Sequence, residues 1–280
     1  MDCLLIAIIF IVLVSIKPTR RFTLYMLPWI LFGFIYSSFN FLPNYEVNSI
    51  DVRGLYDAEK SLFGINSAAG RLIPGEWFAQ HTSPVLDFMG GLFYLCWVPV
   101  PIMFSLYLYF TKRYEWMTRF TWAFLITNLI GFIGYYVYPA APPWYAMNYG
   151  FTPILHTPGN VAGLGRWDAM MGINLFHSIY GKNANVFAAV PSLHAAYLLV
   201  TTIYSVKSHR KWYTSCLFGF ICAGIWFTAV YMGHHYIIDV LLGILTAIIG
   251  VIVTEALWRR PRIQSLFKNN KWLTWNEGRK

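Results

Sequence analysis

Residues 236–257 read YIIDVLLGILTAIIGVIVTEAL, an almost unbroken apolar run. About 20 apolar residues cross the hydrocarbon core of a bilayer as an α-helix, because lipid offers the backbone polar groups no partner outside the segment. We therefore predict a membrane-spanning helix here, and the same reasoning applies to six other runs. The seven predicted helices are residues 3–16, 22–42, 85–110, 118–138, 191–206, 212–233 and 236–257.

The composition agrees with this reading of the runs. Of the 280 residues, 57% are hydrophobic and 12% are charged, whereas soluble domains carry about 25% charged residues. The sequence predicts an all-α, polytopic membrane helix bundle that forms a single transmembrane catalytic domain over residues 1–280. The first and fifth runs are short, so the bundle has either seven membrane-spanning helices or a six-helix core with a partial or peripheral first segment. The first run lacks the preceding basic region and the cleavage site of a signal peptide, so we expect it to be retained.

Basic residues predict the orientation of the bundle. Four regions hold 16 of the 21 Lys and Arg residues, and these regions alternate with the other loops along the chain. Cytoplasmic loops of membrane proteins carry such an excess, which explains the net charge of +9 without nucleic acid as a partner. The residues are Lys17, Arg20, Arg21, Lys112, Arg113, Arg119, Lys207, Arg210, Lys211, Arg259, Arg260, Arg262, Lys268, Lys271, Arg279 and Lys280.

Two long loops then fall on the opposite, outer side. Loop 43–84 mixes charged and apolar residues and has room for a helix lying along the membrane interface. Loop 139–190 is rich in Pro, Gly and Asn and is too long for a simple connection, so we expect a cap or binding loop. The outer side is the periplasmic side of a bacterial inner membrane or the lumen of a Golgi-type membrane, and the basic tail 259–280 is cytoplasmic.

Two histidine motifs lie at the outer ends of predicted helices. Residues 191–194 read PSLH at the start of one run, and residues 234–239 read HHYIID between the last two runs. From His194 the chain crosses the membrane inward, turns, and crosses back to His235. Both imidazoles are therefore expected on the same outer face, where they can share one site.

The spacing within the second motif indicates a catalytic pair. His235 and Asp239 are four residues apart and so share one helix face. The carboxylate then fixes the tautomer of the imidazole and leaves the other ring nitrogen as a nucleophile or base. His194 is available as a second acid or base. Each motif alone is equally compatible with a structural role at a helix end; their convergence on one face favours catalysis.

These motifs resemble the second and third signature motifs of the type 2 phosphatidic acid phosphatase superfamily, whose members transfer phosphoryl groups through a phosphohistidine. Three segments are also similar, in order and spacing, to the fungal-type inositol phosphorylceramide synthases: YPAAPPWY at 138–145, GLGRWD at 163–168 and VPSLH at 190–194. The resemblance covers about residues 130–245. It implies a six-helix phosphatidic-acid-phosphatase-like core, with one extra N-terminal helix possible.

The resemblance also implies roles for individual residues. His235 matches the nucleophile, Asp239 the acid that orients it, and His194 the general acid and base. For phosphate binding we favour Arg166, which lies in the matching GLGRWD text, over Lys182, the other basic residue of loop 139–190. The remaining candidates for substrate contacts are Ser192, His234 and Trp144.

The implied reaction moves a phosphoinositol headgroup from phosphatidylinositol to ceramide or dihydroceramide and releases diacylglycerol. It needs a phospholipid donor and a ceramide-like acceptor but no cofactor and no metal, and no histidine spacing resembles a zinc site. A lipid phosphatase that uses water is the nearest alternative. Phosphatases of this superfamily carry Ser-Arg where this chain has Thr228 and Ala229, and no KxxxxxxRP stretch is present. A proton-coupled transporter is a more remote alternative, because its ionisable groups would lie near mid-membrane.

Overall fold

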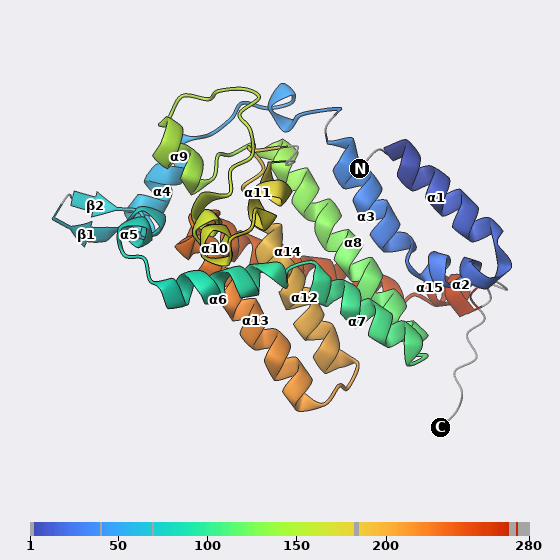
Figure 1. Ribbon diagram of the computed structural model, residues 1–280. Coiled ribbons are helices and arrows are strands. Elements are labelled where there is room, and N and C mark those ends of the chain that lie inside the picture. The colour runs from blue at the N-terminus through green and yellow to red at the C-terminus, as the bar shows by residue number, and fades with distance from the viewer. Residues whose placement is uncertain (1–2, 40, 69, 182–184, 269–272, 274–280) are drawn as a thin grey trace.

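The computed structural model describes residues 3–39, 41–68, 70–181, 185–268 and 273. Most of these residues are helical, and their only strands form one short antiparallel hairpin, β1 (Ile65–Ser67) with β2 (Gly70–Leu72). The predicted all-α class is confirmed. Figure 1 shows a tilted helix bundle with irregular segments gathered at one end.

All seven predicted runs are helical, but two of them are broken. Run 22–42 divides at Met26, and run 85–110 divides between Leu95 and Pro99 with a 42° bend. Proline occupies one of the first two positions of the helix after each break and cannot donate the backbone hydrogen bond that a continuous helix needs there. The bundle helices are α1 (Cys3–Ser15), α2 (Lys17–Tyr25), α3 (Leu27–Ser38), α6 (Pro84–Leu95), α7 (Pro99–Phe110), α8 (Tyr114–Val137), α12 (Leu193–Lys207), α13 (Trp212–Tyr231), α14 (Ile237–Trp258) and α15 (Pro261–Lys268).

Several of these helices are long enough to cross a bilayer. Within the described residues α8, α13 and α14 meet the length and hydropathy of a membrane span individually, and α6 with α7 forms a fourth, bent span. The shorter apolar helix α3 packs against α8, and α1 packs against α3. Helix α12 packs against α13, α14 and α8. The protein is therefore an integral membrane protein with several membrane-embedded helices.

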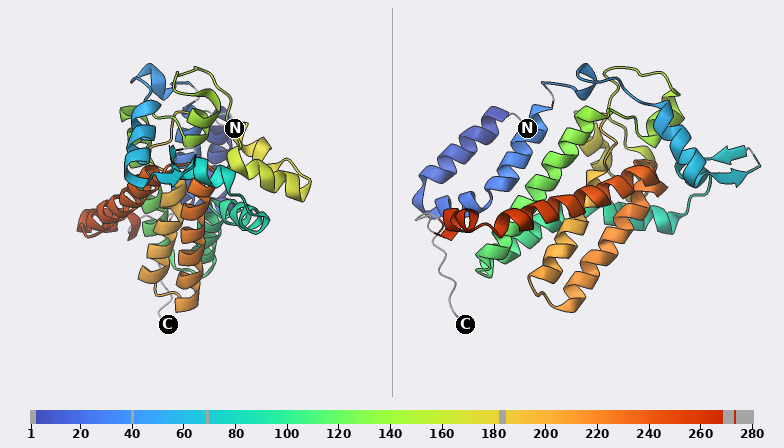
Figure 2. Two further views of the ribbon diagram at one scale, coloured as in Figure 1. Left: turned by 90° about the vertical axis from the view of Figure 1, so that its left-hand side faces the viewer. Right: turned by 180° about the vertical axis from the view of Figure 1, so that it is seen from behind.

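Helix α12 lies at the centre of the packing, against α13 on one side and α14 on the other. The back view in Figure 2 shows α14 running the length of the bundle toward α15. Two glycines permit the close approach of α14 to its neighbours: a Cβ on Gly243 would lie 2.1 Å from the carbonyl oxygen of Ser192, and one on Gly250 would lie 2.1 Å from Thr127. Small residues allow membrane helices to approach in this way.

The outer loops carry the remaining elements, and they are joined to each other. Asp51 donates its backbone N–H to Pro139, and Ala140 donates to Phe187, so segments of both loops run together. Loop 43–84 contains the amphipathic helix that was expected there, α4. The outer elements are η1 (Asn44–Glu46), α4 (Arg53–Phe63), α5 (Pro74–Gln80), α9 (Pro143–Tyr149), η2 (Ala162–Leu164), α10 (Gly165–Met171) and α11 (Leu175–Tyr180).

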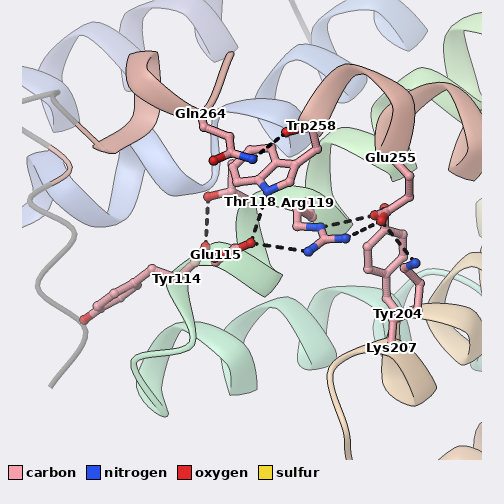
Figure 3. Close-up of polar contacts among 9 residues, drawn as sticks. All are labelled: Tyr114, Glu115, Thr118, Arg119, Tyr204, Lys207, Glu255, Trp258 and Gln264. Atoms are coloured by element: carbon pink, nitrogen blue, oxygen red, sulfur yellow. Dashed lines mark hydrogen bonds and ion pairs between the residues drawn. The ribbon is translucent and has the colours of Figure 1, made fainter. Parts of the chain in front are cut away.

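An ion-pair cluster joins three helices at the opposite end of the bundle (Figure 3). Glu255 of α14 pairs with Arg119 of α8 and with Lys207 of α12, and it accepts a hydrogen bond from the hydroxyl of Tyr204. Arg119 also pairs with Glu115. Two of these helices, α12 and α14, carry the histidine motifs at or next to their other ends, so this cluster helps to fix their relative positions far from the motifs.

Candidate active site

The two predicted imidazoles meet at the N-terminal ends of α12 and α14. His194 Nδ1 lies 3.1 Å from His235 Nε2, and His235 Nδ1 lies 3.4 Å from Asp239 Oδ2. The three side chains therefore form one chain of polar contacts. The structure thus brings together all three residues that the sequence motifs singled out.

Local backbone contacts hold this arrangement. Ser192 caps α12 by accepting the N–H of Ala195, and its own N–H donates to the carbonyl of Asp239 over 3.0 Å. The Asp239 carboxylate in turn accepts the N–H of Tyr236 at the start of α14. One motif is thereby hydrogen-bonded directly to the other. The N–H of Ser192 is committed to this contact.

The tight turn before α14 directs His235 inward. Gly233 has φ +71°, a left-handed conformation that glycine adopts readily. The N–H groups of His234 and His235 both donate to the carbonyl of Ala229 over 2.9 Å. The last turn of α13 thus holds both histidines at fixed positions.

Burial keeps the proposed nucleophile neutral. The side chain of His235 is 8% exposed, and loss of solvation lowers its pKa from 6.5 to about 4. A carboxylate can only accept hydrogen bonds, so we assign the proton to His235 Nδ1, which faces Asp239. Nε2 then carries the lone pair and accepts a hydrogen bond from His194 Nδ1.

His234 points away from this chain of contacts. Its Nε2 lies 3.0 Å from the carbonyl oxygen of Val161, and its ring stacks on Tyr94 and Tyr180. Burial lowers the pKa of His234 well below its ordinary value. This geometry makes it a neighbour of the reacting groups that also anchors the segment before GLGRWD.

Arg166 lies beside the turn that carries the histidines, but its charge is already paired. Its guanidinium contacts a carboxylate oxygen of Asp87 at 2.8 Å and the sulfur of Met232 at 3.3 Å. Asp87 is buried and also accepts the hydroxyl of Tyr231. The nearby N–H of Gly163 donates to Met232, so the GLGRWD segment packs directly on this turn.

Trp144 and Lys182 are the remaining residues that were predicted to contact the substrate. Trp144 donates its backbone N–H to Gly233 over 3.0 Å, and its side chain is buried in an outer hydrophobic cluster with Tyr145 and Phe187. The backbone hydrogen bond of Trp144 therefore helps to hold the turn at Gly233 that precedes the two histidines. Lys182 lies outside the described residues.

Glu59 is a site residue that sequence reasoning missed. This residue of α4 is 1% exposed, and its carboxylate accepts the N–H groups of Ile237 and Ile238 over 2.8 and 3.2 Å. It therefore caps the helix that carries Asp239. A carboxylate at this position stabilises a helix, because it accepts the free N–H groups of the first turn and interacts favourably with the helix dipole. Burial raises the pKa of Glu59 to about 7.

Asp87 was also missed, although the sequence contains a signal for it. An acidic residue inside an otherwise apolar run is costly unless it has a partner, and Asp87 lies within run 85–110. Glu59 gives no comparable signal, because it belongs to a charged loop. Among the residues that the structure describes, no group of three or more His, Cys, Asp or Glu side chains is arranged to hold a metal ion.

Comparison with known families agrees with this geometry. The family model described as "PAP2 superfamily" matches residues 66–253, which include both histidine motifs. The chain belongs to the PAP2 superfamily. This membership confirms the resemblance that the motifs indicated. No solved structure has a significant similarity to the chain.

Curated relatives place the PAP2 domain of this chain in one branch of the superfamily. The chain is 58% identical over 238 residues to the phosphoinositol dihydroceramide synthase of Bacteroides thetaiotaomicron, and the match covers 85% of this chain and 78% of that protein. It is 27% identical to the inositol phosphorylceramide synthase catalytic subunit of Schizosaccharomyces pombe, and 26% identical to that of Saccharomyces cerevisiae. Those matches span 93% and 81% of this chain but only 60% and 55% of the fungal proteins.

Proposed function

We propose that this protein is a sphingolipid synthase that transfers phosphoinositol from phosphatidylinositol to ceramide or dihydroceramide and releases diacylglycerol. The observation that carries the proposal is the chain of contacts from Asp239 through His235 to His194. The name of the 58% identical bacterial relative, phosphoinositol dihydroceramide synthase, supports the choice of headgroup and acceptor.

In the first step the neutral Nε2 of His235 attacks the phosphorus of the donor. A P–N bond forms and the P–O bond to diacylglycerol breaks, while His194, in its imidazolium form, gives its Nδ1 proton to the departing oxygen and becomes neutral. Asp239 stabilises the positive charge that develops on His235. The phosphoinositol group is then held on His235.

In the second step the primary hydroxyl of the ceramide gives its proton to His194. Its oxygen attacks the phosphorus, the P–N bond breaks, and His235 returns to its neutral form. Each histidine ends the cycle in its starting protonation state. The reaction therefore needs no external proton donor.

The resting geometry sets a condition on substrate entry. In this structure the attacking nitrogen, His235 Nε2, and the proton-donating nitrogen, His194 Nδ1, are hydrogen-bonded to each other at 3.1 Å. A phosphodiester that contacts both must separate the two imidazoles and replace this hydrogen bond. We expect His194 to move, because His235 is held by Asp239 and by the turn after α13.

Topology supports a site on the non-cytoplasmic face. The site lies at the bundle end that carries the outer loops, whereas Arg119 and Lys207 lie at the other end (Figures 1 and 3). The positive-inside rule then places the site outward. With a bacterial relative at 58% identity, we propose a single transmembrane catalytic domain in a bacterial inner membrane, with the site facing the periplasm.

The test compares donors and acceptors with detergent-purified protein. Wild type and His235→Ala are incubated with labelled ceramide and, separately, with phosphatidylinositol, phosphatidylethanolamine or phosphatidic acid. We expect a new phosphosphingolipid from phosphatidylinositol with wild type and none with His235→Ala. Free phosphate from phosphatidic acid, with no ceramide product from any donor, would reject the transferase and leave a lipid phosphatase.

A further inference from the structure

Two tyrosine hydroxyls near the histidines lack a partner. Buried polar groups in proteins are almost always hydrogen-bonded, because burial without a partner is costly. Within the described part of the chain, however, the hydroxyl oxygens of Tyr94 and Tyr180 are buried and complete no hydrogen bond. Such a donor close to reacting groups is available to a ligand.

Both phenols belong to the wall of the histidine site. The ring of Tyr94, which is fully buried, stacks at 5.2 Å on His194 and at 5.4 Å on His234. The ring of Tyr180 stacks at 4.6 Å on the same His234. The two hydroxyls lie close enough to interact with each other, and neither has a further partner among the described residues.

The surrounding contacts hold the two phenols on separate elements. Gly91, one turn before Tyr94 on α6, lets Trp167 of α10 approach so closely that a Cβ there would lie 2.0 Å from the indole. Asp168, the next residue of α10, accepts the N–H groups of Phe176 and His177 at the start of α11. Helix α11, which ends with Tyr180, is thereby tied to α10 and through it to α6.

The charge balance of the site calls for additional donors. The guanidinium of Arg166 is paired with Asp87, and Thr228 and Ala229 occupy the positions of the phosphatase Ser-Arg pair. A phosphodiester nevertheless develops more negative charge on its oxygens in the transition state. Fixed donors in a water-poor site stabilise such charge strongly.

We propose that Tyr94 and Tyr180 donate hydrogen bonds to the non-bridging oxygens of the phosphodiester held between His194 and His235. This inference rests on the proposed phosphoinositol transfer and deepens it, because it assigns the groups that bind the phosphate. Tyr94 contacts the ring of His194 and is the more important of the two. Tyr180 reaches the phosphate from the outer cap.

The experiment uses Tyr94→Phe, Tyr180→Phe and the double variant of the full chain. Phenylalanine keeps the ring stacking and removes only the hydroxyl. Tyr114→Phe is the matched control, because Tyr114 is a buried tyrosine at the opposite end of the bundle (Figure 3). Three quantities are measured: kcat for phosphoinositol transfer, the melting temperature, and the rise in melting temperature on adding orthovanadate, which mimics five-coordinate phosphorus.

We expect kcat of Tyr94→Phe to fall about 100-fold, as for the loss of one oxyanion donor, while Tyr114→Phe keeps the wild-type kcat. The melting temperature of Tyr94→Phe should fall little, because the hydroxyl of Tyr94 has only the neighbouring hydroxyl of Tyr180 to lose. The double variant should lose less than the product of the single losses, because both groups bind one phosphate. Vanadate should stabilise wild type and Tyr114→Phe more than Tyr94→Phe.

A wild-type kcat in Tyr94→Phe, or a vanadate shift equal to that of wild type, would overturn the inference. A lower melting temperature with unchanged kcat would show a structural hydroxyl and would also overturn it. Failure of the proposed function looks different: wild type itself would then form no ceramide product. In that case the vanadate shift still decides whether the phenols bind phosphate.

Discussion

His194 Nδ1 and His235 Nε2 are hydrogen-bonded at 3.1 Å, although one residue begins α12 and the other precedes α14. Their separation depends on how closely these two helices approach. The two helices approach closely where Gly243 of α14 faces the carbonyl of Ser192. The proposed chemistry is thus linked to a helix contact about two turns along α14 from His235.

Replacing Gly243 with alanine should separate the two histidines. The new Cβ would lie 2.1 Å from the backbone oxygen of Ser192, so α12 or α14 must shift. We expect kcat to fall by roughly 100-fold, the scale on which a 1 Å misplacement affects catalysis. Gly219→Ala is the control, since its Cβ would meet nothing closer than 3.9 Å. Equal activity of the two variants would contradict this role of the helix contact.

Asp87 should act through Arg166. Asp87→Asn removes the charge that anchors the guanidinium, and Arg166→Gln removes the guanidinium itself. The Asp87–Arg166 pair holds the GLGRWD segment against the turn that carries the histidines, so each change should lower kcat/KM for phosphatidylinositol by about tenfold, the scale of one hydrogen bond to a charged group. The double variant should be little worse than either single variant, because both disrupt one unit. Strictly additive losses would show that the two residues act independently.

Glu59 should make the free energy of unfolding depend on pH, and its contribution should decrease as the pH rises. Its pKa rises from 4.5 to about 7 on folding, so the protonated form is favoured in the folded protein. Its contribution is complete below pH 4.5 and is lost as the pH rises through 7. The melting temperature of wild type relative to Glu59→Gln should therefore fall between pH 5 and pH 8.

The comparison with Glu59→Gln is needed because His235 titrates in the opposite sense. The pKa of His235 falls from 6.5 to about 4 on folding, so this residue lowers stability as the pH drops through that interval. Both proteins contain His235, and the difference between them isolates Glu59. A difference that does not change with pH would refute the assignment.

The cluster in Figure 3 should stabilise the bundle without taking part in catalysis. Glu255→Ala leaves Arg119 and Lys207 without their shared carboxylate, and the side chain of Arg119 is only 14% exposed. We expect a loss of about 3 kcal/mol, the lower end for a broken buried pair. Asp57→Ala breaks a matched i,i+4 pair with Arg53 whose side chains are more than half exposed, and should cost less than about 1 kcal/mol. Equal melting temperatures would exclude a stabilising cluster.

The features of this protein that could be predicted from the sequence are those that depend on residues close together in the chain. Apolar runs fix the helices, and the four-residue spacing of His235 and Asp239 fixes one helix face. The convergence of His194 on His235 followed from counting membrane crossings. These features depend on segment length and helical period, which a single sequence contains.

Contacts between distant segments were beyond sequence reasoning. The capping of α14 by Glu59 joins residues 178 positions apart, and no periodic pattern encodes it. The pairing of Arg166 with Asp87 likewise depends on how α10 packs against α6. The unpartnered hydroxyl of Tyr94 has no sequence signal, because tyrosine in an apolar run is most often a packing residue.

Capture of the covalent intermediate tests the central claim most directly. Wild type, His235→Ala and Asp239→Asn are incubated with phosphatidylinositol labelled in the inositol ring, first without acceptor and then with added ceramide. We predict label bound to wild type at His235, its transfer to ceramide in the second stage, and no bound label in His235→Ala. A ceramide product from His235→Ala at the wild-type rate, or wild-type turnover with no labelled protein under quenching, would contradict the account.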